Sequence, residues 1–135
     1  MLLIILLLFN LNFSNCLSER YLKQISYNSN IRKADYKKFF IDIDGTICYN
    51  KDSDYVNSKP RYDIIRKFNK LYEDGNEVHY WTARGSRSGK EWDHLTKKQM
   101  DIWRVKYTTL NMKKPHYDVW IDDKAININD IDNYI

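Results

Sequence analysis

The fold of this chain is decided by one stretch of sequence, Phe39-Phe40-Ile41-Asp42-Ile43-Asp44-Gly45-Thr46. A short apolar run that ends in acidic residues is typical of a buried strand in a parallel sheet. Gly45 permits a turn out of this strand, because glycine adopts backbone angles that other residues avoid. Asp42 and Asp44 are therefore predicted to face a common site, where two carboxylates repel each other unless a cation or a proton lies between them.

Downstream of this strand, the hydrophobic pattern alternates between helix and strand periodicity. Pro60 opens a predicted helix, with Asn57 or Ser58 near its N-cap, and Gly75 ends it. The order of elements predicts an α/β fold, a Rossmann-like three-layer sandwich with a mostly parallel sheet. The remaining predicted elements are a loop at 47–58, strands at Glu77–Trp81, Tyr107–Leu110 and Tyr117–Ile121, and a helix from about Lys90 to Arg104.

Polar residues stand at the carboxyl ends of three predicted strands, which is where α/β sheets bind their ligands. Clustered carboxylate and carbonyl oxygens suit a hard divalent cation such as Mg²⁺. An isolated pair of acids spaced i, i+2 is more often a loop feature that caps a helix, so the surrounding residues decide between these interpretations. The polar residues at the three strand ends are Asp42 and Asp44, then Thr82 and Arg84, and finally Asp122 and Asp123.

Taken together, these motifs resemble the haloacid dehalogenase (HAD) superfamily of phosphatases and phosphotransferases. The resemblance covers roughly residues 37–130, and a closer likeness that includes Tyr80–Ser86 and Lys114-Pro115 is to small hydrolases of the superfamily that lack a cap domain. It implies a HAD-like core without a cap. The four motifs, in the superfamily's order, are Asp42-x-Asp44-Gly45-Thr46, Thr82 at the end of a hydrophobic strand, Lys114, and Asp122-Asp123.

The resemblance implies a catalytic role for four residues in the hydrolysis of a phosphate monoester. Asp42 would be the nucleophile that forms an aspartyl-phosphate. Asp44 would protonate the leaving oxygen and then activate the hydrolytic water. Thr82 would hydrogen-bond a phosphoryl oxygen, and Lys114 would neutralise charge on the nucleophile and on the transferring group.

The same resemblance implies a metal ion. Mg²⁺ would be bound by the Asp42 carboxylate, the Asp44 backbone carbonyl and Asp122, with Asp123 binding directly or through water. The metal would shield the nucleophile from the charge of the phosphate and orient both groups.

The predicted substrate site is open and lined by basic residues. The intervals between the motifs are too short for a cap domain, so bulky phosphate esters have access unless a neighbouring subunit covers the site. Arg84, Arg87 and Lys90 follow the second strand in a loop that contains glycine, where they are placed to meet an anionic substrate. Thr46 and Gly85 complete the predicted substrate-binding set.

The N-terminal sequence differs in composition from the rest of the 135 residues. Thirteen of the first 17 residues are apolar and none is charged, so all 22 Lys/Arg and all 18 Asp/Glu fall in residues 18–135. Residues 1–17 are predicted to be a hydrophobic leader, either a signal peptide or a short anchor, followed by a polar linker at 18–36 and a catalytic domain at 37–135. A real signal implies a secreted or membrane-anchored protein, and otherwise a cytoplasmic one.

The leading functional hypothesis is Mg²⁺-dependent hydrolysis of a small phosphate monoester, such as a sugar phosphate. One alternative is a polynucleotide 3′-phosphatase, and a non-enzymatic alternative is a phosphate-binding or metal-binding module with the same fold. The net charge of +4 is too modest to indicate a nucleic-acid partner by itself, and the sequence leaves the oligomeric state open.

Overall fold

The structure of the protein is a computed structural model that describes residues 19, 22–23 and 36–135. The predicted leader at 1–17 and most of the predicted linker at 18–36 lie outside the described residues. Residues Lys37–Ile135 form one compact unit. No helix in the described part of the chain is both long and apolar enough to cross a bilayer.

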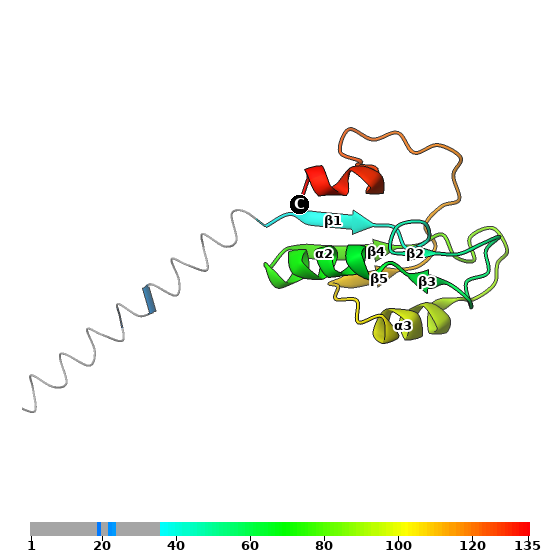
Figure 1. The fold of residues 1–135 in the computed structure, drawn as a ribbon, viewed down its shortest axis with the longest axis horizontal. Coiled ribbons are helices and arrows are strands. Elements are labelled where there is room, and N and C mark those ends of the chain that lie inside the picture. The colour runs from blue at the N-terminus through cyan, green and yellow to red at the C-terminus, as the bar shows by residue number, and fades with distance from the viewer. Residues whose placement is uncertain (1–18, 20–21, 24–35) are drawn as a thin grey trace, which may run out of the picture. The chain divides into compact units, whose positions relative to one another are not determined.

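A parallel three-stranded sheet forms the centre of this unit (Figure 1). Its strands are, in spatial order, β1 (Lys38–Ile41), β4 (Glu77–Trp81) and β5 (Thr109–Asn111). Phe39 lies opposite Val78, and the alternation along both strands places their buried apolar side chains on one face. The predicted α/β class with a parallel sheet is therefore confirmed, and the strand predicted at Glu77–Trp81 has the predicted bounds.

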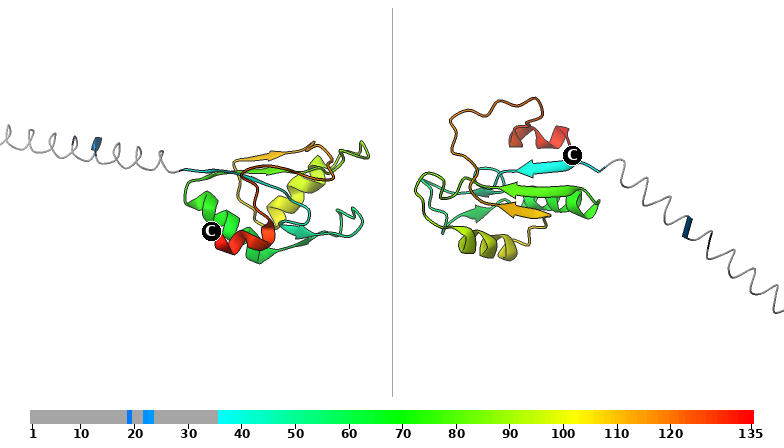
Figure 2. Two further views of the ribbon diagram at one scale, coloured as in Figure 1. Left: turned by 90° about the horizontal axis from the view of Figure 1, so that it is seen from above. Right: turned by 180° about the vertical axis from the view of Figure 1, so that it is seen from behind.

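The two helices, α2 (Tyr62–Glu73) and α3 (Asp93–Ile102), lie on the same face of the sheet. The crossovers from β1 to β4 and from β4 to β5 run in the same direction along the sheet, so right-handed connections place both helices on one side. In the right-hand view of Figure 2 the strands lie in front of the helices. Among the described residues the molecule thus has two layers, and the third layer of the predicted sandwich is not seen.

The hydrophobic core lies between the sheet and these helices. On α2 the buried residues Ile64, Ile65 and Phe68 recur at helical spacing. A 3-10 helix, η1 (Ile128–Asn133), adds Ile128 and Ile131 to this core, and its Asp132 pairs with Lys67 of α2. The strands and α3 contribute Ile41, Val78, Tyr80, Met100 and Trp103 to the core.

The segment before α2 differs from the predicted loop and helix start. A short antiparallel pair forms there, with β2 (Cys48–Tyr49) against β3 (Lys59–Pro60). Pro60 therefore ends a strand, and α2 begins after Arg61, whose backbone N–H donates to the carbonyl of Ile47 at 2.8 Å. The hairpin competes with the helix for these residues, which moves the helix start two residues along the chain.

The strand predicted at Tyr117–Ile121 is absent. These residues are exposed and form no β-strand, and the exposed fractions of Val119 and Ile121 are 74% and 93%. An apolar run forms a sheet strand only where another strand offers its hydrogen-bonding edge, and this run has no such partner among the described residues.

Candidate functional site

Asp42 and Asp44 follow β1 in a tight turn at the carboxyl edge of the sheet. Gly45 occupies the left-handed region at φ 81°, and the backbone N–H of Ile47 donates to the carbonyl of Ile43 at 2.9 Å. Ile43 and Ile47 are fully buried and fix this turn in the core. The two carboxylates stay partly accessible, with 31% of the Asp42 side chain and 22% of the Asp44 side chain exposed.

Asp42 is paired with Lys114, and the two residues form an ion pair at the carboxyl edge of the sheet. The Lys114 ammonium donates to Asp42 Oδ1 and to the Tyr117 hydroxyl, each at 3.2 Å. The backbone N–H of Lys114 donates to the carbonyl of Thr82 at 2.9 Å, which attaches the lysine to the end of β4.

Burial has the largest effect on the pKa of Asp42. It raises the pKa of the carboxyl above its ordinary value, and the opposing attraction of Lys114 does not cancel the effect. Burial also disfavours the Lys114 ammonium, but Asp42 and Tyr117 outweigh this and raise the pKa of the lysine. The site therefore places the Lys114 ammonium beside a partly desolvated carboxyl group.

Asp44 is bound by a different cation, the guanidinium of Arg84. Arg84 Nη2 donates to Oδ1 at 2.7 Å and Nε donates to Oδ2 at 2.9 Å, a two-pronged geometry that fixes the plane of the carboxylate. Thr82 Oγ1 donates to Oδ2 at 3.3 Å, and the Asn50 amide donates to Oδ1. In each of these contacts an Asp44 oxygen accepts the hydrogen bond.

Arg84 is a buried residue with no donor left for a substrate, which corrects its predicted substrate-binding role. Only 2% of it is exposed, because its side chain turns inward under α3. Nη1 donates to Thr96 Oγ1 at 3.2 Å and to Gln99 Oε1 at 2.6 Å, and Nη2 also reaches Cys48 Sγ at 3.7 Å. Together with Asp44, these acceptors match all five guanidinium N–H groups.

Thr82 lies where the motif predicts, at the end of β4, but its hydroxyl is occupied. The residue is fully buried, and Oγ1 accepts from the backbone N–H of Arg84 at 3.1 Å while it donates to Asp44. In this arrangement the hydroxyl orients Asp44, and its single proton does not point toward a phosphoryl oxygen.

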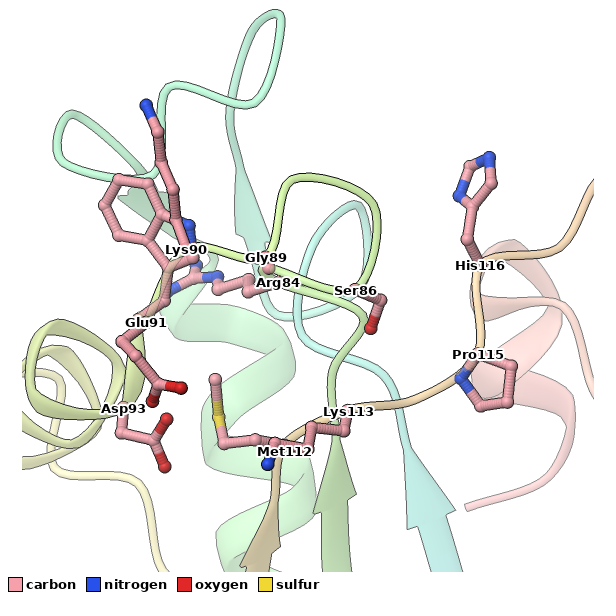
Figure 3. A pocket seen from close by; sticks show the side chains of 12 residues that line it. Arg84, Ser86, Gly89, Lys90, Glu91, Asp93, Met112, Lys113, Pro115 and His116 are labelled. Atoms are coloured by element: carbon pink, nitrogen blue, oxygen red, sulfur yellow. The ribbon is translucent and has the colours of Figure 1, made fainter.

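The loop after β4 borders a hollow of about 390 Å³ (Figure 3). Gly85 has φ 83°, and a Cβ there would lie 2.2 Å from the carbonyl oxygen of Lys90, so the two arms of the loop touch. Arg87 and Lys90 are exposed. Ser86 Oγ donates to the carbonyl of Lys114 at 2.6 Å and joins this loop to the segment that carries the lysine. The hollow lies between residues 84–93 and residues 112–116.

The remaining predicted site residues are not gathered here. Thr46 lies in the turn after β1, and its carbonyl accepts from Arg61 Nη1 at 3.1 Å. Asp122 and Asp123 are exposed in the segment after Tyr117, where the backbone N–H of Lys124 donates to Asp122 Oδ1 at 2.7 Å and lowers the pKa of that carboxyl.

The predicted Mg²⁺ ligand set does not fit this arrangement. Among the residues that the structure describes, no group of three or more His, Cys, Asp or Glu is placed to hold a metal ion. Asp42 and Asp44 supply the first half of the predicted set, and the half that Asp122 and Asp123 would supply lies elsewhere. The assignment of Mg²⁺ rests on the resemblance alone.

Sequence reasoning missed two polar residues that complete the site. Asn50 donates to Asp44 from a segment predicted to be a loop, where nothing in the pattern distinguishes it from its neighbours. Gln99 has a usable signal, because Thr96, Gln99, Met100 and Trp103 follow i, i+3, i+4, i+7 spacing and all are buried. A polar side chain on such a stripe requires a buried partner, and here the partner is Arg84.

Comparison with known proteins supports the fold class. No protein-family model matches the chain, and no curated protein matches it either. The crystal structure of a target protein from Vibrio cholerae is similar, with a TM-score of 0.63 and 28% sequence identity over 70% of this chain and 85% of that one. That protein carries no functional name. The fold and the site thus define an α/β protein with paired carboxylates at the carboxyl edge of a parallel sheet.

Proposed function

We propose that this chain hydrolyses a phosphate monoester through an aspartyl-phosphate on Asp42, in a HAD-like core without a cap. The observation that supports this most directly is the position of two aspartates with separate partners in one turn. Lys114 forms an ion pair with Asp42. Asp44 forms an ion pair with Arg84 and accepts a hydrogen bond from Thr82. One carboxylate is free to attack while the other is fixed in orientation, a division of roles that two-step acyl-phosphate chemistry requires.

In the first step, an Asp42 oxygen attacks phosphorus and the bond from phosphorus to the ester oxygen breaks. Lys114 stabilises the charge on the nucleophile and on the transferring group, because its ammonium lies 3.2 Å from Asp42 Oδ1. The leaving oxygen takes up a proton as the alcohol departs. The proposed donor is Asp44, which must carry that proton when the ester binds.

In the second step, water attacks the phosphorus of the aspartyl-phosphate and the bond to the Asp42 oxygen breaks. The proton of the water passes to Asp44, which the first step has left ionised and whose oxygens are held by Arg84. This transfer restores the proton that Asp44 gives up in the next turnover. Inorganic phosphate leaves and Asp42 is restored. No part of either step is assigned to a metal ion.

The proposed substrate is a small phosphorylated molecule such as a sugar phosphate. A hollow of about 390 Å³ lies beside the segment that carries Lys114, and its volume is in the range of small-molecule sites. Neither Asp42 nor Asp44 lines this hollow, so it supports the size of the substrate and not its contact with the nucleophile. Its lining includes Trp92 together with residues of both charges, among them Lys90 and Glu91. Such a mixture suits a polar, uncharged organic group better than a polyanion.

The test is turnover of a panel of phosphate esters by the full-length chain, with and without Mg²⁺. The panel includes an aryl phosphate, sugar phosphates, nucleotides and 3′-phosphorylated oligonucleotides. Asp42→Asn is expected to abolish turnover, while Asp101→Asn, the same change at an exposed position of α3, leaves it unchanged. Asp44→Asn is expected to slow hydrolysis of the phospho-enzyme, which acid quenching with labelled substrate detects. Full activity of Asp42→Asn contradicts the covalent mechanism.

A further inference from the structure

Gln99 links three segments that surround Asp44. The residue lies on α3 and is 7% exposed. Its Oε1 accepts from Arg84 Nη1 at 2.6 Å, and its Nε2 donates to the backbone carbonyl of Tyr55 at 2.6 Å. The two partners fix the orientation of the amide, because only its oxygen accepts from a guanidinium and only its nitrogen donates to a carbonyl.

The contacts of Gln99 hold one edge of the Arg84 guanidinium. Thr96, three residues earlier on α3 and fully buried, accepts from the same Nη1 at 3.2 Å. The Tyr55 ring lies over the guanidinium carbon at 4.8 Å and covers its face. A guanidinium is planar and rigid, so acceptors on one edge set the direction of the opposite edge. That opposite edge is the one that binds Asp44.

We infer that Gln99 is a positioning residue of the proposed active site, which fixes the carboxylate of Asp44 through Arg84. This inference rests on the proposed function, because it concerns the rate of proton transfer by Asp44. Without Gln99, Nη1 keeps only the longer contact to Thr96, and the guanidinium tilts in its pocket. The carboxylate then loses the aligned pair of hydrogen bonds that holds its plane.

The expected effect is on kcat and not on KM. Asp44 transfers a proton to the leaving oxygen and from the water, and neither transfer contributes to binding of the intact ester. Displacement of a catalytic group by about 1 Å costs up to about a hundredfold in rate.

The experiment compares Gln99→Met and Gln99→Glu with a matched control, Asn69→Leu. Met keeps the length of the side chain and removes both hydrogen bonds, whereas Glu keeps the acceptor for Arg84 and loses the donor to Tyr55. Asn69 is also an amide that joins two backbone groups, since it donates to the carbonyl of Arg104 and accepts from the N–H of Lys106, each at 2.8 Å. It has no contact with the site.

Gln99→Met is expected to lower kcat by about tenfold to a hundredfold with KM changed by less than about twofold. Gln99→Glu is expected to recover most of this loss, although its unfolding temperature falls like that of Gln99→Met. Asn69→Leu lowers the unfolding temperature as well and leaves kcat unchanged. Equal losses of kcat in the Met and Glu variants, or an equal loss in Asn69→Leu, overturn the inference.

A second measurement follows Arg84 directly by NMR. The Nε–H of a buried, paired arginine exchanges slowly with water, and the Arg84 signal is assigned by its absence in Arg84→Lys. Loss of this protection is expected in Gln99→Met and not in Asn69→Leu. If the native chain shows no turnover, the proposed function and this inference are both overturned. An active native enzyme with unchanged kcat in Gln99→Met overturns this inference alone.

Discussion

The chain has two pairs of aspartates, each after an apolar run, and the two pairs differ in burial and in the groups they contact. Asp42 and Asp44 lie in a turn between fully buried isoleucines, and each has a cation of its own. Asp122 and Asp123 lie on an exposed segment, where Asp122 contacts the backbone of Lys124. The first run enters β1, which is paired with β4 from Lys38 to Ile41, whereas the second has no strand beside it among the residues that the structure describes.

The difference shows that a carboxylate becomes part of a site through the packing of its neighbours. The apolar runs look alike in the sequence, but in the described part of the chain only the run that begins at Phe39 pairs with a strand whose buried face matches its own. The predictions below change one side of this comparison at a time, beginning with the largest effect.

Arg84→Met tests how strongly the first pair is held. It removes the cation from Asp44 and leaves buried acceptors on Thr96 and Gln99 without their donor. Breaking a buried ion pair on one side costs about 3–5 kcal/mol of the free energy of unfolding. Urea unfolding measures this, with Arg87→Met, an exposed position of the same loop, as the control. A loss no larger than that of the control would show that the pair contributes little.

Gly85→Ala and Gly89→Ala compare two glycines within the loop that carries Arg84. Both have positive φ, which costs alanine about 1–2 kcal/mol. At Gly85 the new Cβ also meets the backbone oxygen of Lys90, and we expect about 1–3 kcal/mol more from this overlap. At Gly89 the space is open. Equal unfolding midpoints for the two variants would contradict the close approach of the loop arms.

Asp42→Asn tests the cost in stability of a charged carboxylate at this partly buried position. Burial raises the pKa of Asp42 above 3.8 in the folded state, so the folded chain binds this proton more tightly than the unfolded chain. Stability therefore falls as pH rises from 3.8 through the raised pKa, and the loss is complete above it. Asparagine does not ionise, so at neutral pH the variant is expected to unfold at a higher temperature than the native chain.

The check is the unfolding temperature of both proteins from acid to neutral pH. The unfolding temperature of the native chain is expected to fall as pH rises from 3.8 through the raised pKa of Asp42. The contribution of Asp42 to this fall is expected to be absent in Asp42→Asn. The rate of the proposed reaction should change in the opposite direction, because only the ionised Asp42 attacks phosphorus. A variant that is less stable than the native chain at neutral pH would contradict the dominance of burial over the attraction of Lys114.

Asp122→Asn and Asp123→Asn are expected to have the smallest effect. Both side chains are exposed, and such substitutions change the free energy of unfolding by no more than about 0.5 kcal/mol. Thermal unfolding measures this, and turnover is measured on the same samples. Loss of turnover at unchanged stability would show that the reaction brings this segment to Asp42. A clear loss of stability would instead show that the segment is packed in solution.

Much of the fold follows from periodicity in the sequence. The strand Glu77–Trp81 alternates between buried and partly exposed residues, and Gly75 follows α2 where the pattern ends. Local patterns do not say which strand pairs with which. Local patterns therefore could not predict the pairing of Cys48 with Pro60 or the absence of a strand at Tyr117–Ile121.

The candidate site was also predictable only in part. The pairing of Asp42 with Lys114 joins residues 72 positions apart, and only the resemblance to a known superfamily suggested that they lie together. The direction of the Arg84 side chain was not predictable from a loop rich in glycine and serine, because an arginine after a strand has both solvent and the underside of α3 within reach. The buried acceptors on Thr96 and Gln99 decide between them.

The burial of Cys48 gives this molecule an internal chemical reporter. The thiol is fully buried, it donates to the carbonyl of Ile43 at 3.6 Å, and burial raises its pKa to about 12. Alkylating reagents attack the thiolate, so Cys48 in the closed protein is almost inert toward them. Since Sγ also touches Arg84, the rate at which a reagent labels Cys48 measures how often the interior around Asp44 opens to water.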